Sequence, residues 1–129
     1  MASNLFKIEK LTRYIGAYIV GLDLKEQLNQ ETVRALYQAW LDHIVLVFRD
    51  CNLTQEDQIR ITNYFGRQAK LARPAKYHPP GYSKILPNIM LISNIRENGE
   101  PIGALPDGEM MFHHDMLHAK IPDKGTMLY

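Results

Sequence analysis

Histidine is concentrated in one short segment of the chain. Residues 110–118 read MMFHHDMLH and hold three of the five histidines in the sequence, with one aspartate among them. Neutral imidazole and carboxylate groups bind divalent metal ions, so this segment is the first candidate for a metal site. Which of its side chains share a metal depends on whether the segment forms a strand or a helix.

A strand is the first interpretation of this segment. Successive side chains of a strand alternate between faces, so His113 and Asp115 would point the same way and His114 the opposite way. One imidazole and one carboxylate are two of the three ligands of the facial triad that holds non-haem Fe(II) and leaves coordination positions open. This interpretation requires a second histidine ligand that is distant in the sequence.

A helix is the rival interpretation, and it predicts a different metal. His114 and His118 lie four residues apart with Asp115 between them, which resembles the H-E-x-x-H pattern of zinc hydrolases. Aspartate is shorter than the glutamate of that pattern, and Gly108 and Pro122 leave little room for a helix. The zinc hydrolase is therefore a minor alternative. A third alternative needs no metal: the histidines are half-buried polar residues that form hydrogen bonds at the end of a strand.

Length and composition limit the class of protein. A chain of 129 residues suits a single domain over 1–129 with a real core. The net charge is +1 and the basic residues are scattered, which argues against nucleic acid or a membrane surface as partner. Cys51 is the single cysteine, so an internal disulfide is excluded. No apolar run is long enough to span a bilayer, and a cytoplasmic protein is the expectation.

The first half of the chain predicts two strands, a helix, a third strand and a second helix. The strands at 5–11 and 17–20 flank a turn at Gly16. Thr54 and Asp57 have the spacing of a helix N-cap and its acidic partner, and Gly66 follows as a stop signal. The IVLVFRD segment at 44–50 is predicted to be a buried strand. The first helix is indicated by apolar residues that recur at helical spacing, namely Val33, Leu36, Tyr37, Trp40, Leu41 and Ile44.

The second half predicts a proline-rich loop at 67–88, turns and loop at 97–109, and further strands. The long loop carries Tyr77 and His78, which are candidates to line a lid. The predicted strands lie at 89–93, 110–117 and 125–129. Because the last strand would expose an unpaired edge, we expect a longer protein, a homo-oligomer or a partner chain that covers that edge.

Several stretches, taken in order, resemble the N-terminal half of the TauD/TfdA family of Fe(II)/2-oxoglutarate-dependent dioxygenases. Individually each stretch is modest, and it is the ordered set that carries the resemblance. The stretches are IGAYIVGLDL (15–24), LDHIVLVFRD (41–50), LTQEDQIRITNYFG (53–66), LISN (91–94) and FHHDMLHAKIPDKGTMLY (112–129).

The resemblance implies an α+β, mainly β fold: an incomplete double-stranded β-helix, or jelly roll, of the clavaminate synthase-like type with N-terminal helices outside the sheet. His113 and Asp115 would be iron ligands, with His114 as the variable residue between them. Fe(II), 2-oxoglutarate and O₂ would hydroxylate a small organic substrate and release succinate and CO₂. Asn94 and Glu109 are the positions that would face the substrate.

The chain also departs from the family pattern. The second iron-binding histidine and the arginine that holds 2-oxoglutarate are expected beyond Tyr129, so no residue here takes either role. Ala69-Lys70-Leu71 stands where the taurine enzyme has a His-x-His, so taurine is not supported as the substrate. The main alternative is a non-catalytic remnant or one subunit of a split enzyme, which needs a partner chain.

Overall fold

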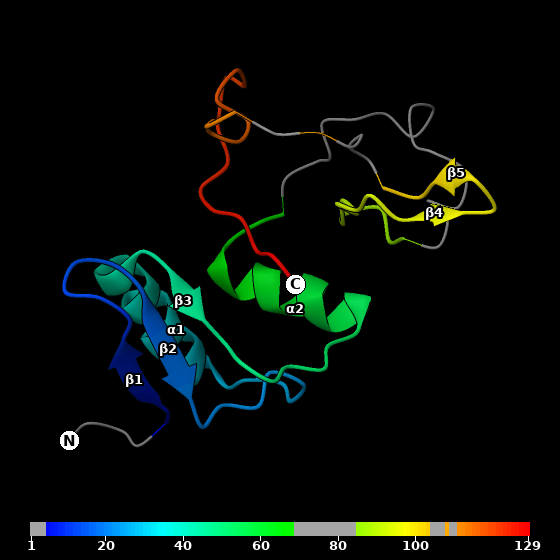
Figure 1. Ribbon diagram of the computed structural model, residues 1–129. Helices are drawn as coiled ribbons and strands as arrows, with labels where there is room; N and C mark the ends of the chain where they lie inside the picture. Colours follow the sequence, from blue (N-terminus) through cyan, green and yellow to red (C-terminus); the bar gives the residue numbers. More distant parts are fainter. Residues whose placement is uncertain (1–4, 69–84, 104–107, 109–110) are drawn as a thin grey trace. The chain divides into compact units, whose positions relative to one another are not determined.

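The computed structural model describes residues 5–68, 85–103, 108 and 111–129. The chain divides into two compact units, Met1–Gly66 and Arg67–Tyr129, and each is described by itself (Figure 1). Among the described residues no helix is long and apolar enough to cross a membrane.

A three-stranded sheet forms the frame of the first unit. β1 (Lys7–Lys10) pairs with β2 (Ala17–Val20) in antiparallel fashion, and β2 pairs with β3 (Leu46–Val47) in parallel fashion. Gly16 precedes β2 with φ of 89°, a conformation that glycine adopts at little cost. The two strands predicted around Gly16 are therefore confirmed.

Helix α1 (Gln30–His43) connects β2 to β3, as the parallel pairing requires. Asn29 caps it by accepting a hydrogen bond from the Thr32 amide at 2.9 Å. Leu36 is buried at the centre of its inner face. The predicted apolar stripe extends further than the buried face, because Leu41 and Ile44 are 55% and 61% exposed.

The strand predicted at 44–50 is much shorter than expected, and it is not buried. Ile44 has φ of 68° as the C-cap of α1, so the chain is still turning at that position. Only Leu46 and Val47 pair with β2, and both are half-buried. β-branched composition alone therefore overestimated the strand, because the backbone has positive φ at Ile44 and at Asp50, on either side of the paired residues.

Helix α2 (Gln55–Phe65) begins and ends where the sequence predicts. Thr54 Oγ1 accepts from the Asp57 amide at 3.2 Å, and Asp57 Oδ2 accepts from the Thr54 amide at 3.0 Å. This reciprocal capping box satisfies two amides that the helix itself leaves unpaired. Gly66 ends the helix, and its amide donates to the Thr62 carbonyl at 3.3 Å.

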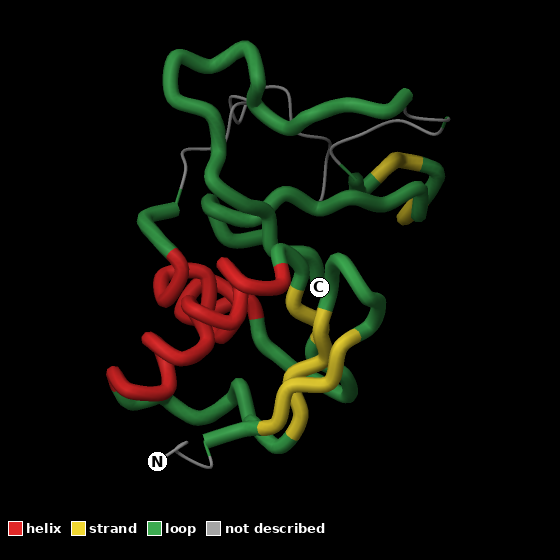
Figure 2. The backbone as a smooth tube through the Cα atoms, turned by 90° about the vertical axis from the view of Figure 1, so that its left-hand side faces the viewer, coloured by secondary structure: helices red, strands yellow, loops and turns green. Residues whose placement is uncertain are grey.

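In the first unit the helices lie beside the strands of the sheet (Figure 2), and the core is formed by side chains of α1 and the sheet. Ile19 of β2 packs with Leu36 and Ala39 of α1, and all three are at most 5% exposed. Trp40 lies edge-on to Phe65 of α2, with ring centroids 5.7 Å apart, which joins the two helices. Tyr37 and Trp40 are half-buried and contact each other, which confirms their packing role.

The second unit contains a hairpin that the sequence analysis assigned to turns and loop. β4 (Arg96–Glu97) pairs with β5 (Glu100–Pro101) in antiparallel fashion. Asn98 and Gly99 connect them with φ of 52° and 85°. Two left-handed residues in succession make a type I′ turn, for which Asn-Gly is the favoured pair.

The three strands predicted at 89–93, 110–117 and 125–129 are absent from the described residues of this unit. A strand is stable only where a neighbour pairs with its backbone, and the described part of this unit supplies none to these segments. Of the proline-rich loop, residues 69–84 lie outside the described residues, and with them Tyr77 and His78.

Candidate metal centre

His113 and Asp115 converge, as the sequence predicts, although they do so on a loop instead of a strand. His113 Nε2 lies 3.0 Å from Asp115 Oδ1. Each side chain is 53% exposed, so a small ion in solution can reach the pair. By simple geometry, neighbouring ligands at about 2.1 Å from an octahedral ion lie about 3 Å apart. His113 Nε2 and Asp115 Oδ1 thus have the spacing of two adjacent ligand atoms on one cation.

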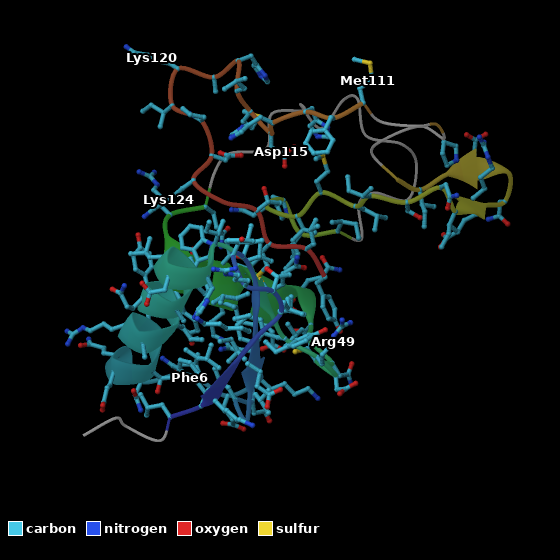
Figure 3. All side chains as sticks on the ribbon, turned by 60° about the vertical axis from the view of Figure 1, so that its left-hand side comes forward. Phe6, Arg49, Met111, Asp115, Lys120 and Lys124 are labelled. Atoms are coloured by element: carbon cyan, nitrogen blue, oxygen red, sulfur yellow. The ribbon has the colours of Figure 1, made fainter. Side chains whose placement is uncertain are left out.

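The orientation of the His113 ring is set by a second contact. Its Nδ1 lies 2.9 Å from the Met111 carbonyl oxygen, on the same loop as Asp115 (Figure 3). A carbonyl only accepts, so Nδ1 carries a proton. Nε2 donates to Asp115 Oδ1 when the ring is protonated, and in the neutral ring its lone pair is available to a metal ion. Metal-binding histidines usually donate their other N–H in this way.

The same contacts affect the pKa of His113. The hydrogen bond to Met111, followed by the interaction with the Asp115 carboxylate, raises the pKa of His113 above its ordinary value. A proton on Nε2 and a cation at that atom both neutralise the facing carboxylate. Proton and metal ion therefore compete for the same position.

Asp115 has a partner that the sequence analysis did not identify. Thr126 Oγ1 donates to Asp115 Oδ2 at 3.1 Å, so one carboxylate oxygen faces His113 and the other faces Thr126. Thr126 lies eleven residues downstream, in a segment predicted to be a strand. No local sequence signal connects threonine to an aspartate at that separation.

His114 and His118 do not have the helical arrangement that the zinc pattern needs. His114 Nδ1 lies 2.9 Å from the backbone carbonyl oxygen of Asp115. Residues 115–118 form turns, and Met116 has φ of 53°, which an α-helix does not accommodate. The i, i+4 spacing therefore does not place these two histidines on one helical face.

The two predicted substrate positions have different outcomes. Asn94 is exposed and lies just before the β4–β5 hairpin. The backbone is closely packed beside that hairpin, since a Cβ on Gly103 would lie 2.8 Å from the Ser93 carbonyl carbon. Glu109 lies outside the described residues.

The donor set suits Fe(II) but is incomplete. Imidazole and carboxylate are two members of the 2-His-1-carboxylate set. The described residues contain no group of three His, Cys, Asp or Glu side chains that could hold one ion together. The pair therefore fits Fe(II) as two of its three protein ligands, and a third ligand is needed to complete the set.

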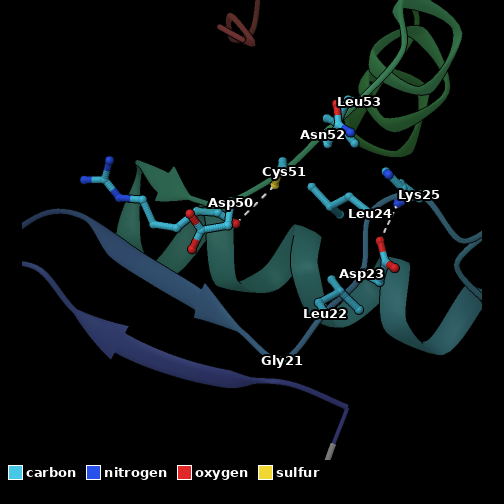
Figure 4. A pocket seen from close by; sticks show the side chains of 10 residues that line it. Gly21, Leu22, Asp23, Leu24, Lys25, Asp50, Cys51, Asn52 and Leu53 are labelled. Carbon is cyan, nitrogen blue, oxygen red and sulfur yellow. Dashed lines mark hydrogen bonds between the residues drawn. The ribbon is translucent and has the colours of Figure 1, made fainter.

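A pocket of about 460 Å³ lies in the first unit, between the loops 21–25 and 49–53 (Figure 4). Asp23 accepts from the Lys25 amide at 2.9 Å, and the Cys51 thiol donates to the Arg49 carbonyl at 3.5 Å. Burial, followed by nearby Asp23 and Asp50, raises the pKa of Cys51, so the thiol is a poor nucleophile.

Arg49, which borders this pocket, contacts Tyr18 of β2. Its guanidinium lies over the Tyr18 ring, 5.3 Å from the centroid, and donates to the Tyr18 hydroxyl at 3.1 Å. This contact also raises the pKa of Arg49.

Comparison with known families decides the class of this chain. The model of the family described as "Taurine catabolism dioxygenase TauD, TfdA family" matches residues 7–129. The chain belongs to this family. TauD/TfdA membership agrees with the resemblance that the ordered stretches carry. The matched residues include the segment with His113 and Asp115.

Individual relatives agree with the family assignment. The (S)-phenoxypropionate/alpha-ketoglutarate-dioxygenase of Sphingobium herbicidovorans is 27% identical over 125 residues, which cover 97% of this chain and 40% of that protein. Pentalenolactone F synthase of Streptomyces avermitilis is 33% identical over 103 residues, which cover 78% of this chain and 32% of that protein. The chain thus spans well under half the length of these TauD/TfdA relatives.

A solved structure also matches. A Burkholderia xenovorans protein, provisionally named an alpha-ketoglutarate-dependent taurine dioxygenase, superimposes with a TM-score of 0.52 at 30% identity. The match covers 59% of this chain and 27% of that one. Part of this chain therefore has the backbone arrangement of a TauD-like dioxygenase.

Proposed function

We propose that this chain carries the His-x-Asp part of an Fe(II)- and 2-oxoglutarate-dependent dioxygenase. The reaction is hydroxylation of a small organic substrate by O₂, with release of succinate and CO₂. The fold that we propose for the whole domain is the double-stranded β-helix, to which the described strands and helices contribute an outer part.

The observation that carries the proposal is the 3.0 Å approach of His113 Nε2 to Asp115 Oδ1 in a chain of the TauD/TfdA family. Family membership supports the dioxygenase class, and the relatives named after alpha-ketoglutarate support the co-substrate. The geometry adds that the two donor atoms face each other and that the Met111 carbonyl holds the His113 ring.

Each residue has a defined task in this proposal. His113 and Asp115 bind the iron, which when bound supplies the activation of O₂ for attack on a C–H bond. Their half-exposed positions leave room for further ligands. Asn94 and Glu109 are proposed to contact the substrate. No described residue is assigned the role of the arginine or of the second histidine.

A second candidate is a subunit that is inactive until a partner chain covers it. The observation that favours it is a set of apolar side chains in residues 111–129 that are more than 60% exposed. These are Met111, Phe112, Leu117, Ile121, Leu128 and Tyr129. Exposed apolar residues gathered in one segment support the proposal that a partner chain covers this surface. Light scattering with size-exclusion chromatography tests this candidate, and a stable monomer at high concentration contradicts it.

The test of the iron site is an anaerobic Fe(II) titration in the presence of 2-oxoglutarate. We expect a visible charge-transfer band from the chelated co-substrate, with weak affinity because the chain supplies two protein ligands. His113→Ala removes one of them and should abolish the band. His114→Ala is the matched control, because its ring contacts a backbone carbonyl and not the Asp115 carboxylate.

The outcomes separate the candidates. A band that persists in His113→Ala, or a folded chain that shows no band at all, contradicts iron binding at this pair. Zinc binding that is lost in His118→Ala and retained in His113→Ala would instead support the hydrolase alternative.

A further inference from the structure

The Asp115 carboxylate is held from both sides. Oδ1 lies 3.0 Å from His113 Nε2, and Oδ2 accepts from Thr126 Oγ1 at 3.1 Å. The second contact is the tertiary one, because it joins segments that are eleven residues apart.

A half-exposed aspartate does not hold one orientation without help. The last torsion of aspartate is broad, and the Asp115 side chain is 53% exposed. A donor on Oδ2 restricts this rotation, and it leaves Oδ1 directed at the His113 ring. The Thr126 hydroxyl is placed to do this, and its rotatable O–H adapts to the acceptor.

The backbone between Asp115 and Thr126 turns, which brings the two side chains within hydrogen-bonding distance. Met116 has φ of 53°, and the Ala119 amide donates to the Met116 carbonyl at 2.9 Å, so the chain turns directly after Asp115. An extended continuation would carry residue 126 about 36 Å away. The turn instead leaves Thr126 within hydrogen-bonding distance of the carboxylate.

We propose that Thr126 is a positioning residue of the metal centre: its hydroxyl orients the Asp115 carboxylate so that Oδ1 and His113 Nε2 bind one ion together. The inference rests on the proposed function, since it presupposes a metal at His113 and Asp115. Thr126 itself does not touch the ion. Its effect reaches the metal through the preorganisation of Asp115, and partners of this kind typically change metal affinity by about 10–100-fold.

The test is Mn(II) binding to the full 129-residue chain, followed by electron paramagnetic resonance of the free ion, with the metal alone as probe. Thr126→Val keeps the side-chain shape and removes the hydroxyl, so we expect affinity to fall about tenfold. Thr126→Ser retains the hydroxyl and should bind within about threefold of the parent chain. Rescue by serine separates positioning from packing, because serine loses the methyl group that valine keeps.

Controls distinguish failure of this inference from failure of the proposed function. Circular dichroism should be unchanged in both variants, as Thr126 is exposed, and Thr126→Ala serves as a second variant if valine disturbs the fold. Equal affinity in Thr126→Val and the parent, with binding lost in His113→Ala, overturns the positioning role and leaves the metal site standing. Binding that is absent from the parent chain, or unaffected by His113→Ala, overturns both.

Discussion

Arg60 Nη2 lies 2.7 Å from Asp57 Oδ1, one turn away on α2. The same guanidinium donates to the carbonyls of Leu24 at 2.9 Å, Lys25 at 3.0 Å and Glu26 at 3.0 Å. These acceptors are 34 to 36 residues earlier in the chain. One side chain thus fastens the loop before α1 to the first turns of α2, and Asp57 holds it in place.

This arrangement makes the stability of the first unit depend on pH. The Arg60 hydrogen bond, followed by the Thr54 amide, holds the pKa of Asp57 below its usual value. A depressed carboxyl pKa stabilises the fold above the unfolded-state value of about 3.9, and this contribution is lost as pH falls through the folded-state pKa. Urea unfolding followed by Trp40 fluorescence at neutral pH and at about pH 3 measures the effect. Asp57→Asn should show a smaller loss between the two pH values, and an identical loss contradicts the prediction.

Replacing Arg60 with lysine should lower the free energy of unfolding by about 1–3 kcal/mol. Lysine keeps the charge, but it has one ammonium group and cannot reach three carbonyls and a carboxylate in the way that the planar guanidinium does. Chemical denaturation measures the change. Arg34→Lys on the exposed side of α1 is the control and should be close to neutral. Equal effects of the two substitutions would show that the Arg60 contacts contribute little.

Leu36→Ala should destabilise the first unit by about 2–5 kcal/mol, because it leaves a cavity in the core. Leu36 is 0% exposed, whereas Leu41 on the same helix is 55% exposed. Leu41→Ala is therefore a matched control, with an expected cost well below that of Leu36→Ala. The single tryptophan, Trp40, reports unfolding in both cases. Similar losses of unfolding free energy in Leu36→Ala and Leu41→Ala would contradict the placement of Leu36 in the core.

Gly103→Ala should disrupt the hairpin of the second unit. The added Cβ would collide with the Ser93 backbone, which is not a flexible side-chain end and cannot move aside cheaply. The Ile102 amide donates to the Ile95 carbonyl at 3.2 Å, so faster hydrogen exchange at Ile102 is the measurement. Gly66→Ala is the control, since a Cβ there meets nothing within 4 Å and φ of 162° is extended. Unchanged protection at Ile102 in Gly103→Ala would rule out the collision.

Features that depend on neighbours along the chain were predictable from the sequence. The capping box of Thr54 and Asp57 spans three residues, and the structure confirms both it and the helix end before Gly66. The approach of His113 to Asp115 was also predictable, since the two are separated by one residue. The Asn98-Gly99 hairpin had a local signal as well, which the sequence analysis read only as a turn.

Tertiary structure alone decided the rest. Within the described residues, the strand patterns at 89–93, 110–117 and 125–129 did not become strands, because a strand exists only where another segment pairs with its backbone. Arg60 and Thr126 acquired their roles in the same way, as their acceptors lie far from them in sequence. By itself, the sequence determined the two helices, the cap of α2 and the two candidate iron ligands. Only the folded chain decided what holds those ligands in place, because hydrogen bonds between distant residues form after the backbone has brought them together.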